Sequence, residues 1–178
     1  MKVYLFLVTG FEEIEAVAAI DVLRRAEIDV KTVSITGNQA VEGAHGIVVQ
    51  ADALFENCDF SNGQMLILPG GTIKLGEHEA LVQLIKEYYK NEKYIAAICA
   101  APMILGNLGL LQGKEAIAYP GFEKYLKGAI LSSEKVVRAG KIITAKGPGA
   151  TIDFALKIVE TLKSKELASK LAEEMIHT

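Results

Sequence analysis

Cys99 is the residue in this sequence best suited to nucleophilic chemistry, because it lies between a predicted strand and a predicted helix. The preceding run, residues 95–98, is apolar, which is typical of a strand buried on both faces of a parallel sheet. Pro102 follows and suits the first turn of a helix. A cysteine at such a turn lies near unpaired backbone amides, which favours the reactive thiolate. A plain core cysteine is the alternative that this fragment leaves open.

Glu15 is the second candidate, because its carboxylate heads an apolar face of a predicted helix. The helix is expected to begin at Glu12 or Glu13. The residues that follow Glu15 on its face are all apolar: Ala18, Ala19, Val22 and Ala26. A carboxylate there is unfavourable unless it is partnered or protonated, so we expect Glu15 to be functional. Glu12 and Glu13 are interpreted only as charges that suit the positive end of the helix dipole.

Two glycines, Gly70 and Gly71, follow a predicted buried strand over residues 65–68. Glycine permits positive φ and lets backbone amides approach a ligand closely. Beside a nucleophile such amides could stabilise an oxyanion, although an ordinary glycine turn is the alternative.

The order of the predicted elements implies that these residues lie together. Strands alternate with helices, which is typical of an α/β fold with a mostly parallel sheet covered by helices on both faces. The predicted strands are 3–8, 30–35, 65–68, 95–99 and 116–118, with hairpins over 39–50 and 136–144. The predicted helices are 12–26, 79–91, 102–108, 151–162 and a last one that carries Leu167, Leu171 and Met175.

In sheets of this kind the chemistry gathers at the carboxyl ends of the strands. Five loop signals fall at those ends: residues 9–10, 70–71, Cys99, Tyr119 and 147–149. This convergence favours a site built on Cys99.

Length and composition predict one soluble domain over residues 1–178, with 51% hydrophobic and 23% charged residues. The net charge of −3 is interspersed, so we expect no nucleic-acid partner, and no apolar run is long enough to span a membrane. The two cysteines form neither a disulfide framework nor a metal-ligand spacing, which predicts a reducing cytoplasm and no metal. Cys58 is interpreted as an incidental surface thiol, and His45 as an exposed hairpin histidine without a ligand partner.

Five segments together resemble the ThiJ/PfpI superfamily, and within it the Parkinsonism-associated protein deglycase and its bacterial relatives. They are FEEIEAVAAIDVLRRA, ILPGG, AAICAAP, AYPGFE and KGPGATIDFALKIVETL, so the resemblance runs nearly end to end. It implies a flavodoxin-like three-layer sandwich, related to class I glutamine amidotransferase domains and commonly homodimeric, without a cofactor.

The resemblance also implies roles for individual residues. Cys99 matches the reactive elbow cysteine, and Glu15 matches a buried, protonated glutamate that hydrogen-bonds the sulfur. Gly71 and Ala100 match the positions whose backbone amides face the cysteine, as an oxyanion hole would. A glutamate that shares a hydrogen with the sulfur would hold Cys99 as a thiolate and would stabilise a sulfinate after oxidation.

The chain departs from the family pattern where histidines are concerned. Many members carry a histidine in place of Tyr119, and the protease-like branch carries one in place of Ala100. None of the chain's own histidines falls at a matching position: His45, His78 and His177. Proteolysis, which needs a base and an acid, is therefore not expected, and Tyr119 could at most orient or donate. The family's GPGT motif appears here as GPGAT over residues 147–151. Its hydroxyl is therefore displaced by one residue to Thr151, whose role stays open.

Three classes of function are consistent with these residues. The first is an enzyme that acts through Cys99 and Glu15 on a small carbonyl such as methylglyoxal, or on a glycated protein. The second is an oxidative-stress sensor or chaperone whose Cys99 is oxidised to a sulfinate. The third is a binding module for a nucleotide or thiazole precursor, which is less supported because no GxGxxG or P-loop pattern is present.

Overall fold

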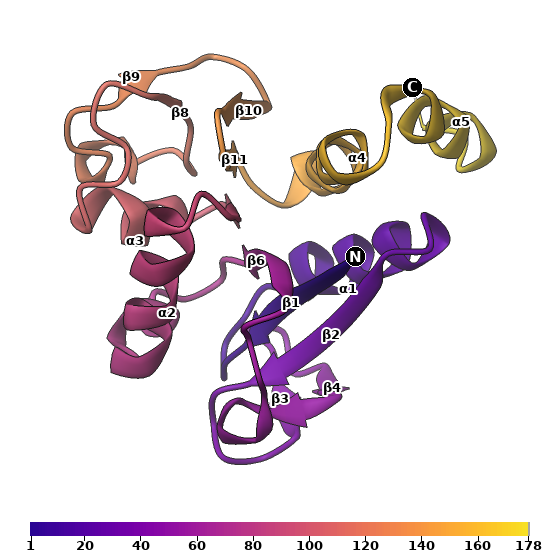
Figure 1. The fold of residues 1–178 in the computed structure, drawn as a ribbon, viewed down its shortest axis with the longest axis vertical. Helices are drawn as coiled ribbons and strands as arrows, with labels where there is room; N and C mark the ends of the chain where they lie inside the picture. The colour runs from indigo at the N-terminus through magenta and orange to yellow at the C-terminus, as the bar shows by residue number, and fades with distance from the viewer. Residues whose placement is uncertain (178) are drawn as a thin grey trace.

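A seven-stranded sheet forms the centre of the protein, whose computed structural model describes residues 1–177 (Figure 1). The strand order is β10-β11-β7-β6-β1-β2-β5, and every neighbouring pair is parallel except β10–β11. The strands are β1 Lys2–Leu7, β2 Asp29–Ser34, β5 Ala53–Leu54, β6 Gly63–Leu68, β7 Tyr94–Ile98, β10 Val136–Ala139 and β11 Ile142–Ala145. The predicted, mostly parallel sheet is confirmed.

Helices cover both faces of this sheet. They are α1 Glu13–Arg25, α2 Glu79–Lys90, α3 Pro102–Asn107, α4 Thr151–Leu162 and α5 Lys165–Glu174. The apolar residues of α1 and α4 share one buried cluster with one side of the strands, while those of α2 and α3 share a second cluster on the other side. Helix α5 packs against α4, at the upper right of Figure 1. The predicted three-layer α/β sandwich is thus confirmed.

Strand β1 shows why the sheet is buried on both faces. Val3, Leu5 and Leu7 point into the cluster under α1 and α4, whereas Tyr4 and Phe6 point into the cluster under α2. Side chains along a strand alternate between faces, so a continuous apolar run fits only a central strand.

Two short pairings lie outside the central sheet. The predicted hairpin over 39–50 is confirmed as β3 Ala40–Glu42 against β4 Val48–Gln50. The strand predicted over 116–118 is wrong as a member of the central sheet, because β8 Glu115–Ala116 pairs with β9 Ile130–Leu131 instead. At the next residue the Ile117 N–H donates to the Thr144 side-chain hydroxyl at 3.0 Å.

Within residues 1–177 no helix is both long enough and apolar enough to cross a bilayer.

Candidate active site

Cys99 occupies a sharp turn between β7 and α3. Its φ is +66°, a left-handed value that is unusual for a residue with a side chain. Two backbone hydrogen bonds fix the turn: the Cys99 N–H donates to Ala145 O at 2.9 Å, and the Tyr119 N–H donates to Cys99 O at 2.8 Å. Only 9% of Cys99 is exposed. The turn therefore holds the sulfur in one place, at the carboxyl end of the sheet.

Glu15 projects from the first turn of α1 into the core, where only 1% of it is exposed. The Gly70 N–H donates to Glu15 Oε2 at 2.7 Å. The other oxygen, Oε1, is buried without a regular hydrogen-bond partner among residues 1–177. Burial raises the pKa of Glu15 to about 7, although hydrogen bonds with Cys99 and the Gly70 amide act in the opposite direction. A proton on the carboxyl would give the orphaned oxygen a hydroxyl, with the Cys99 sulfur as its neighbouring acceptor.

The sulfur does not become a thiolate through its position alone. Burial, followed by the charge and the hydrogen bond of ionised Glu15, raises the pKa of Cys99 to about 12. The Gly71 and Ala100 amides hydrogen-bond the sulfur and lower the pKa, but less strongly. The amides at the turn lower the pKa of the thiol, as the sequence predicts, but burial and ionised Glu15 raise it more.

The charge state of Cys99 instead depends on where the pair keeps its protons. Two groups this close titrate as a unit, so the protonation state of the carboxyl affects the charge that the sulfur can carry. When Glu15 is protonated, its hydroxyl stabilises a negative sulfur. When Glu15 is ionised, it opposes one. Glu15 and Cys99 can therefore exchange a proton inside the protein.

Gly70 is needed because the pair leaves no room for a side chain. A Cβ at this position would lie 2.6 Å from Cys99 Cβ and 2.7 Å from Glu15 Oε2. Gly71, next in the chain, has a φ of +85°, which turns its amide toward the sulfur. The structure therefore brings four of the sequence-predicted residues together: Cys99, Glu15, Gly71 and Ala100.

Tyr119 borders this group without joining it. Its backbone is bonded to Cys99, but its side chain is 46% exposed and its ring faces Gly147. Thr151, whose role the sequence left open, is buried and donates its hydroxyl hydrogen to Pro148 O at 2.8 Å. Its hydroxyl therefore closes the 147–151 loop.

Glu13 has a role that the sequence did not reveal. It is 5% exposed rather than solvated, and its Oε1 accepts from the N–H groups of His45 at 2.7 Å and Ile47 at 3.4 Å. Its Oε2 lies 2.9 Å from His45 Nδ1. We call this contact between α1 and the β3–β4 hairpin the Glu13 latch. The interpretation of Glu13 as a mere dipole charge is wrong. His45 is an exposed hairpin histidine, as predicted, and the sequence did not reveal its contact with Glu13.

Glu12, Glu13 and His45 are also the side chains within residues 1–177 that could share a cation, since their ligand atoms lie within 4.8 Å of one another. The Glu13 oxygens are already satisfied by hairpin donors. The hydrogen bonds of the Glu13 latch therefore explain why these side chains lie together.

The latch should hold the hairpin most firmly at mildly acidic pH. Partial burial acts to raise the pKa of Glu13, but hydrogen bonds from the His45 side chain and the hairpin backbone outweigh it and lower the pKa to about 2. The hydrogen bond to Glu13, followed by the charge of Glu12, raises the pKa of His45 above 6.5. Glu13 contributes stability above pH 4.5 that is lost as pH falls toward 2, and His45 contributes stability below pH 6.5 that is lost as pH rises.

Hydrogen exchange of the His45 and Ile47 amides, corrected for intrinsic rates, should therefore show the strongest protection between about pH 4.5 and 6.5. Glu13→Gln should remove this maximum. Equal protection across the range in both proteins would mean that the latch has no energetic role.

Cys58 is not the surface thiol that the sequence suggested. It is half-buried against the apolar cluster on the α2 side of the sheet, and its Sγ donates to Leu54 O at 3.4 Å. Burial raises its pKa, so it should react slowly with thiol probes.

Known proteins resemble this chain in both sequence and structure. The model of the DJ-1/PfpI family matches residues 1–161. "Protein DJ-1 homolog B" of Arabidopsis thaliana is 37% identical over 98% of this chain, which spans only 41% of that relative's length. "Glutathione-independent glyoxalase DJR-1.2" of Caenorhabditis elegans is 32% identical over 92% of this chain and 89% of its own. The solved structure "Toxoplasma gondii DJ-1, oxidized" superposes with a TM-score of 0.95 at 36% identity, covering 99% of this chain and 98% of that one.

Proposed function

This chain belongs to the DJ-1/PfpI family, and from that premise we propose that it is a cofactor-independent enzyme that acts on reactive carbonyls. Its substrate would be a small 2-oxoaldehyde such as methylglyoxal, or the early adduct of one on a protein. Cys99 is the nucleophile and Glu15 is the general acid and base. The observation that carries the proposal is the buried pair itself, a carboxyl whose pKa lies at about 7 beside a sulfur on a strained turn. A relative named as a glutathione-independent glyoxalase supports the same reading.

The reaction begins when the Cys99 sulfur adds to the aldehyde carbon. Ionised Glu15 takes the S–H proton as the C–S bond forms and the C=O π bond breaks, and it passes this proton to the carbonyl oxygen. The amides of Gly71 and Ala100 already point at the sulfur, so an oxygen attached to the adjacent carbon could accept from them as charge develops.

Glu15 then moves two further protons. It removes the hydrogen on the former aldehyde carbon and passes this proton to the oxygen of the neighbouring carbon, which gives an enediol. It then carries the hydroxyl proton of the first carbon to the neighbouring carbon, which produces a lactoyl thioester on Cys99. The first carbon is oxidised and the second is reduced, so no external oxidant is needed. Water then cleaves the C–S bond, which releases lactate and restores the thiol. A single carboxyl that performs every transfer, without the histidine of many relatives, predicts slow turnover.

An oxidative-stress sensor is the second candidate, favoured by the orphaned oxygen of Glu15. A hydroxyl there could donate to a Cys99 sulfinate and protect it from further oxidation. One solved relative is described as an oxidized DJ-1.

Lactate formation separates the two candidates. Purified protein is incubated with methylglyoxal in D₂O, and lactate and its deuterium content are followed by NMR. Parallel samples are titrated with peroxide, and Cys99 is analysed by mass spectrometry. Steady lactate production, retained in Cys58→Ser, supports the enzyme. Complete sulfinate formation at low peroxide without any lactate would contradict it and favour the sensor.

The functional form is proposed to be a homodimer in the cytoplasm, where both free thiols would remain reduced. Four exposed apolar side chains support the dimer: Ile14 and Val17 on α1, with Ile47 and Val48 at the hairpin. The Glu13 latch holds the two segments together, so we expect these residues to form one surface, which we call the α1–hairpin patch. Large apolar patches on a soluble protein mark interaction surfaces.

Val17→Asp places a charge in the α1–hairpin patch and is expected to convert the dimer into a monomer, as measured by sedimentation equilibrium. Ile130→Asp, at an exposed apolar residue of β9, is the control and should leave the dimer intact. A wild-type monomer at high concentration would refute the dimer.

A further inference from the structure

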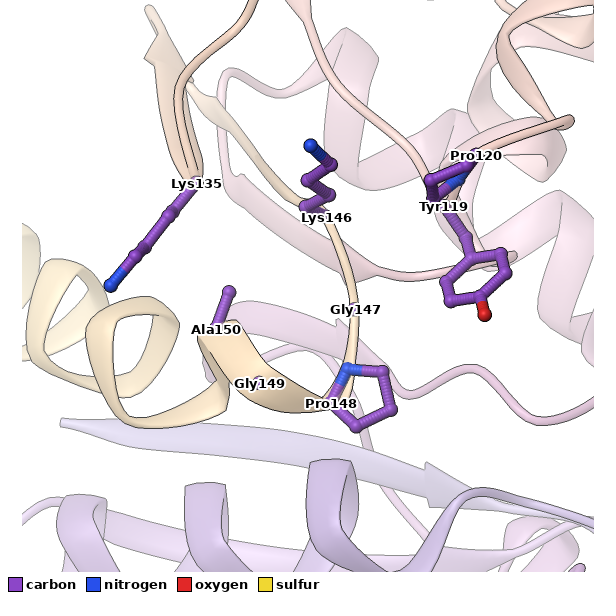
Figure 2. A pocket seen from close by; sticks show the side chains of 8 residues that line it. All are labelled: Tyr119, Pro120, Lys135, Lys146, Gly147, Pro148, Gly149 and Ala150. Atoms are coloured by element: carbon purple, nitrogen blue, oxygen red, sulfur yellow. The ribbon is translucent and has the colours of Figure 1, made fainter.

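A pocket of about 290 Å³ lies next to the Cys99 turn and takes no part in the chemistry described above (Figure 2). Residues 119–120 and 146–150 line it together with Lys135. Figure 2 shows the Tyr119 ring on one side of the 146–150 loop and the Lys135 side chain on the other. The pocket is large enough for a group of several heavy atoms, well beyond what methylglyoxal itself would fill.

The pocket is continuous with the structure that holds Cys99. Lys146 follows Ala145, whose carbonyl accepts from the Cys99 N–H at 2.9 Å. On the opposite wall, the Tyr119 N–H donates to Cys99 O at 2.8 Å. One wall, at Lys146, is therefore adjacent in sequence to a residue that hydrogen-bonds Cys99, and the other wall, at Tyr119, hydrogen-bonds Cys99 directly. A substrate joined to the sulfur could extend its remaining atoms past Tyr119 into this space.

The charges in the pocket are all positive. Its lining holds two lysines and no acid. Lys135 Nζ forms an ion pair with Asp153 Oδ2 at 3.4 Å. The other oxygen, Asp153 Oδ1, lies 3.0 Å from His177 Nε2. Lys146 has no ion-pair partner in the described part of the chain. The Lys146 N–H also donates to Lys135 O at 3.0 Å, which ties the two segments together.

We propose that this pocket binds the anionic end of the carbonyl substrate, a carboxylate or phosphate held by Lys146 and assisted by Lys135. The apolar faces of Tyr119 and Pro148 would cover the carbon atoms between that anion and the carbonyl. This inference rests on the proposed function and names its substrate class: 2-oxoaldehydes that carry a negative charge at the far end, in preference to neutral ones. Lys146 is then a specificity-determining residue.

Matched substrates test this preference. 4,5-Dioxovalerate and 2-oxopentanal present the same oxoaldehyde with and without a carboxylate, and hydroxypyruvaldehyde phosphate and hydroxypyruvaldehyde do so for phosphate. Because one charge-assisted hydrogen bond contributes roughly 1.5–3 kcal/mol, kcat/KM for the anionic member should exceed that of the neutral member by about tenfold or more in at least one pair. The pair with the larger ratio identifies the anion.

Lys146→Met should abolish this ratio by lowering kcat/KM for the anionic member, and added salt should weaken the ratio in wild type. Asp153→Asn should raise the ratio, because it releases Lys135. Lys86→Met, at an exposed lysine on α2, is the control and should leave the ratio unchanged. Equal kcat/KM values within both pairs, or equal losses in Lys86→Met and Lys146→Met, would overturn the inference.

A readout without catalysis keeps this test separate from that of the proposed function. In a Cys58→Ser background, Cys99 is alkylated with 3-maleimidopropionate or with N-propylmaleimide, which differ in the terminal carboxylate. The anionic reagent should react faster in wild type, and Lys146→Met should remove that advantage. If no dicarbonyl is turned over, the proposed function fails. The maleimide ratio then still decides the anion pocket, and a ratio unaffected by Lys146→Met would refute it.

Discussion

Methylglyoxal turnover is expected to fall to the uncatalysed background in Cys99→Ser and by about 10²–10⁴-fold in Glu15→Gln. The serine hydroxyl occupies the same turn but is far less acidic than a thiol, and it cannot form the thioester. Glutamine keeps the shape of Glu15 and can still contact the Gly70 amide, but it cannot accept and return a proton. Initial lactate rates on the three proteins measure both effects. A Glu15→Gln variant with wild-type rates would remove Glu15 from the mechanism.

The same variant should change how stability depends on pH. The pKa of Glu15 is raised from 4.5 to about 7 by burial, so the folded protein binds a proton that the unfolded chain has released. This contribution is fully present below pH 4.5 and is lost as pH rises through about 7. Relative to Glu15→Gln, the wild type should therefore lose on the order of 3 kcal/mol of unfolding free energy between about pH 4 and 8.

Urea unfolding at the two pH values measures this difference directly. Parallel pH profiles for the two proteins would show that Glu15 keeps an ordinary pKa in the fold, and the acid-base role would then lose its physical basis.

The sequence predicts those site residues whose role can be inferred from neighbouring positions in the chain. Glu15 stood out because an ionisable group headed an otherwise apolar helix face, and Cys99 because it followed a buried strand. Both inferences need only neighbouring residues, and the structure places the two side chains together. The order of strands and helices likewise predicted the layers of the sandwich.

Features that depend on long-range packing could not be predicted in this way. The Glu13 latch joins residues 32 positions apart, and nothing near either end of it marks the contact. The raised pKa of Cys99 depends first on burial and then on Glu15, quantities that a turn motif does not contain. The short strand β8 pairs with β9 outside the central sheet, and the next residue, Ile117, donates to the side chain of Thr144, 27 positions away.

Gly70→Ala is expected to lower methylglyoxal turnover at Cys99 strongly while the protein remains folded. The added Cβ would lie 2.6 Å from Cys99 Cβ and 2.7 Å from Glu15 Oε2, and 3.1 Å from the Ala100 nitrogen. Neither the backbone nor the buried carboxyl can move without a large cost in free energy. The side chains of Glu15 and Cys99 must therefore separate. Overpacking of this kind typically reduces the unfolding free energy by about 1–3 kcal/mol. Because the proton-transfer geometry is lost as well, methylglyoxal turnover should fall by about 10²-fold, the loss expected from an ångström-scale displacement.

Gly37→Ala separates the local effect of this methyl group from a general loss of stability. Gly37 lies in an exposed turn with a φ of +79°, and a Cβ there would meet nothing within 4 Å. Its substitution should therefore destabilise the protein by about 1–2 kcal/mol through backbone strain alone, leaving turnover unchanged. The comparison uses urea unfolding and lactate rates on both variants. If Gly70→Ala and Gly37→Ala lose equal stability and both keep full turnover, close packing of Gly70 against the Glu15–Cys99 pair does not control the chemistry.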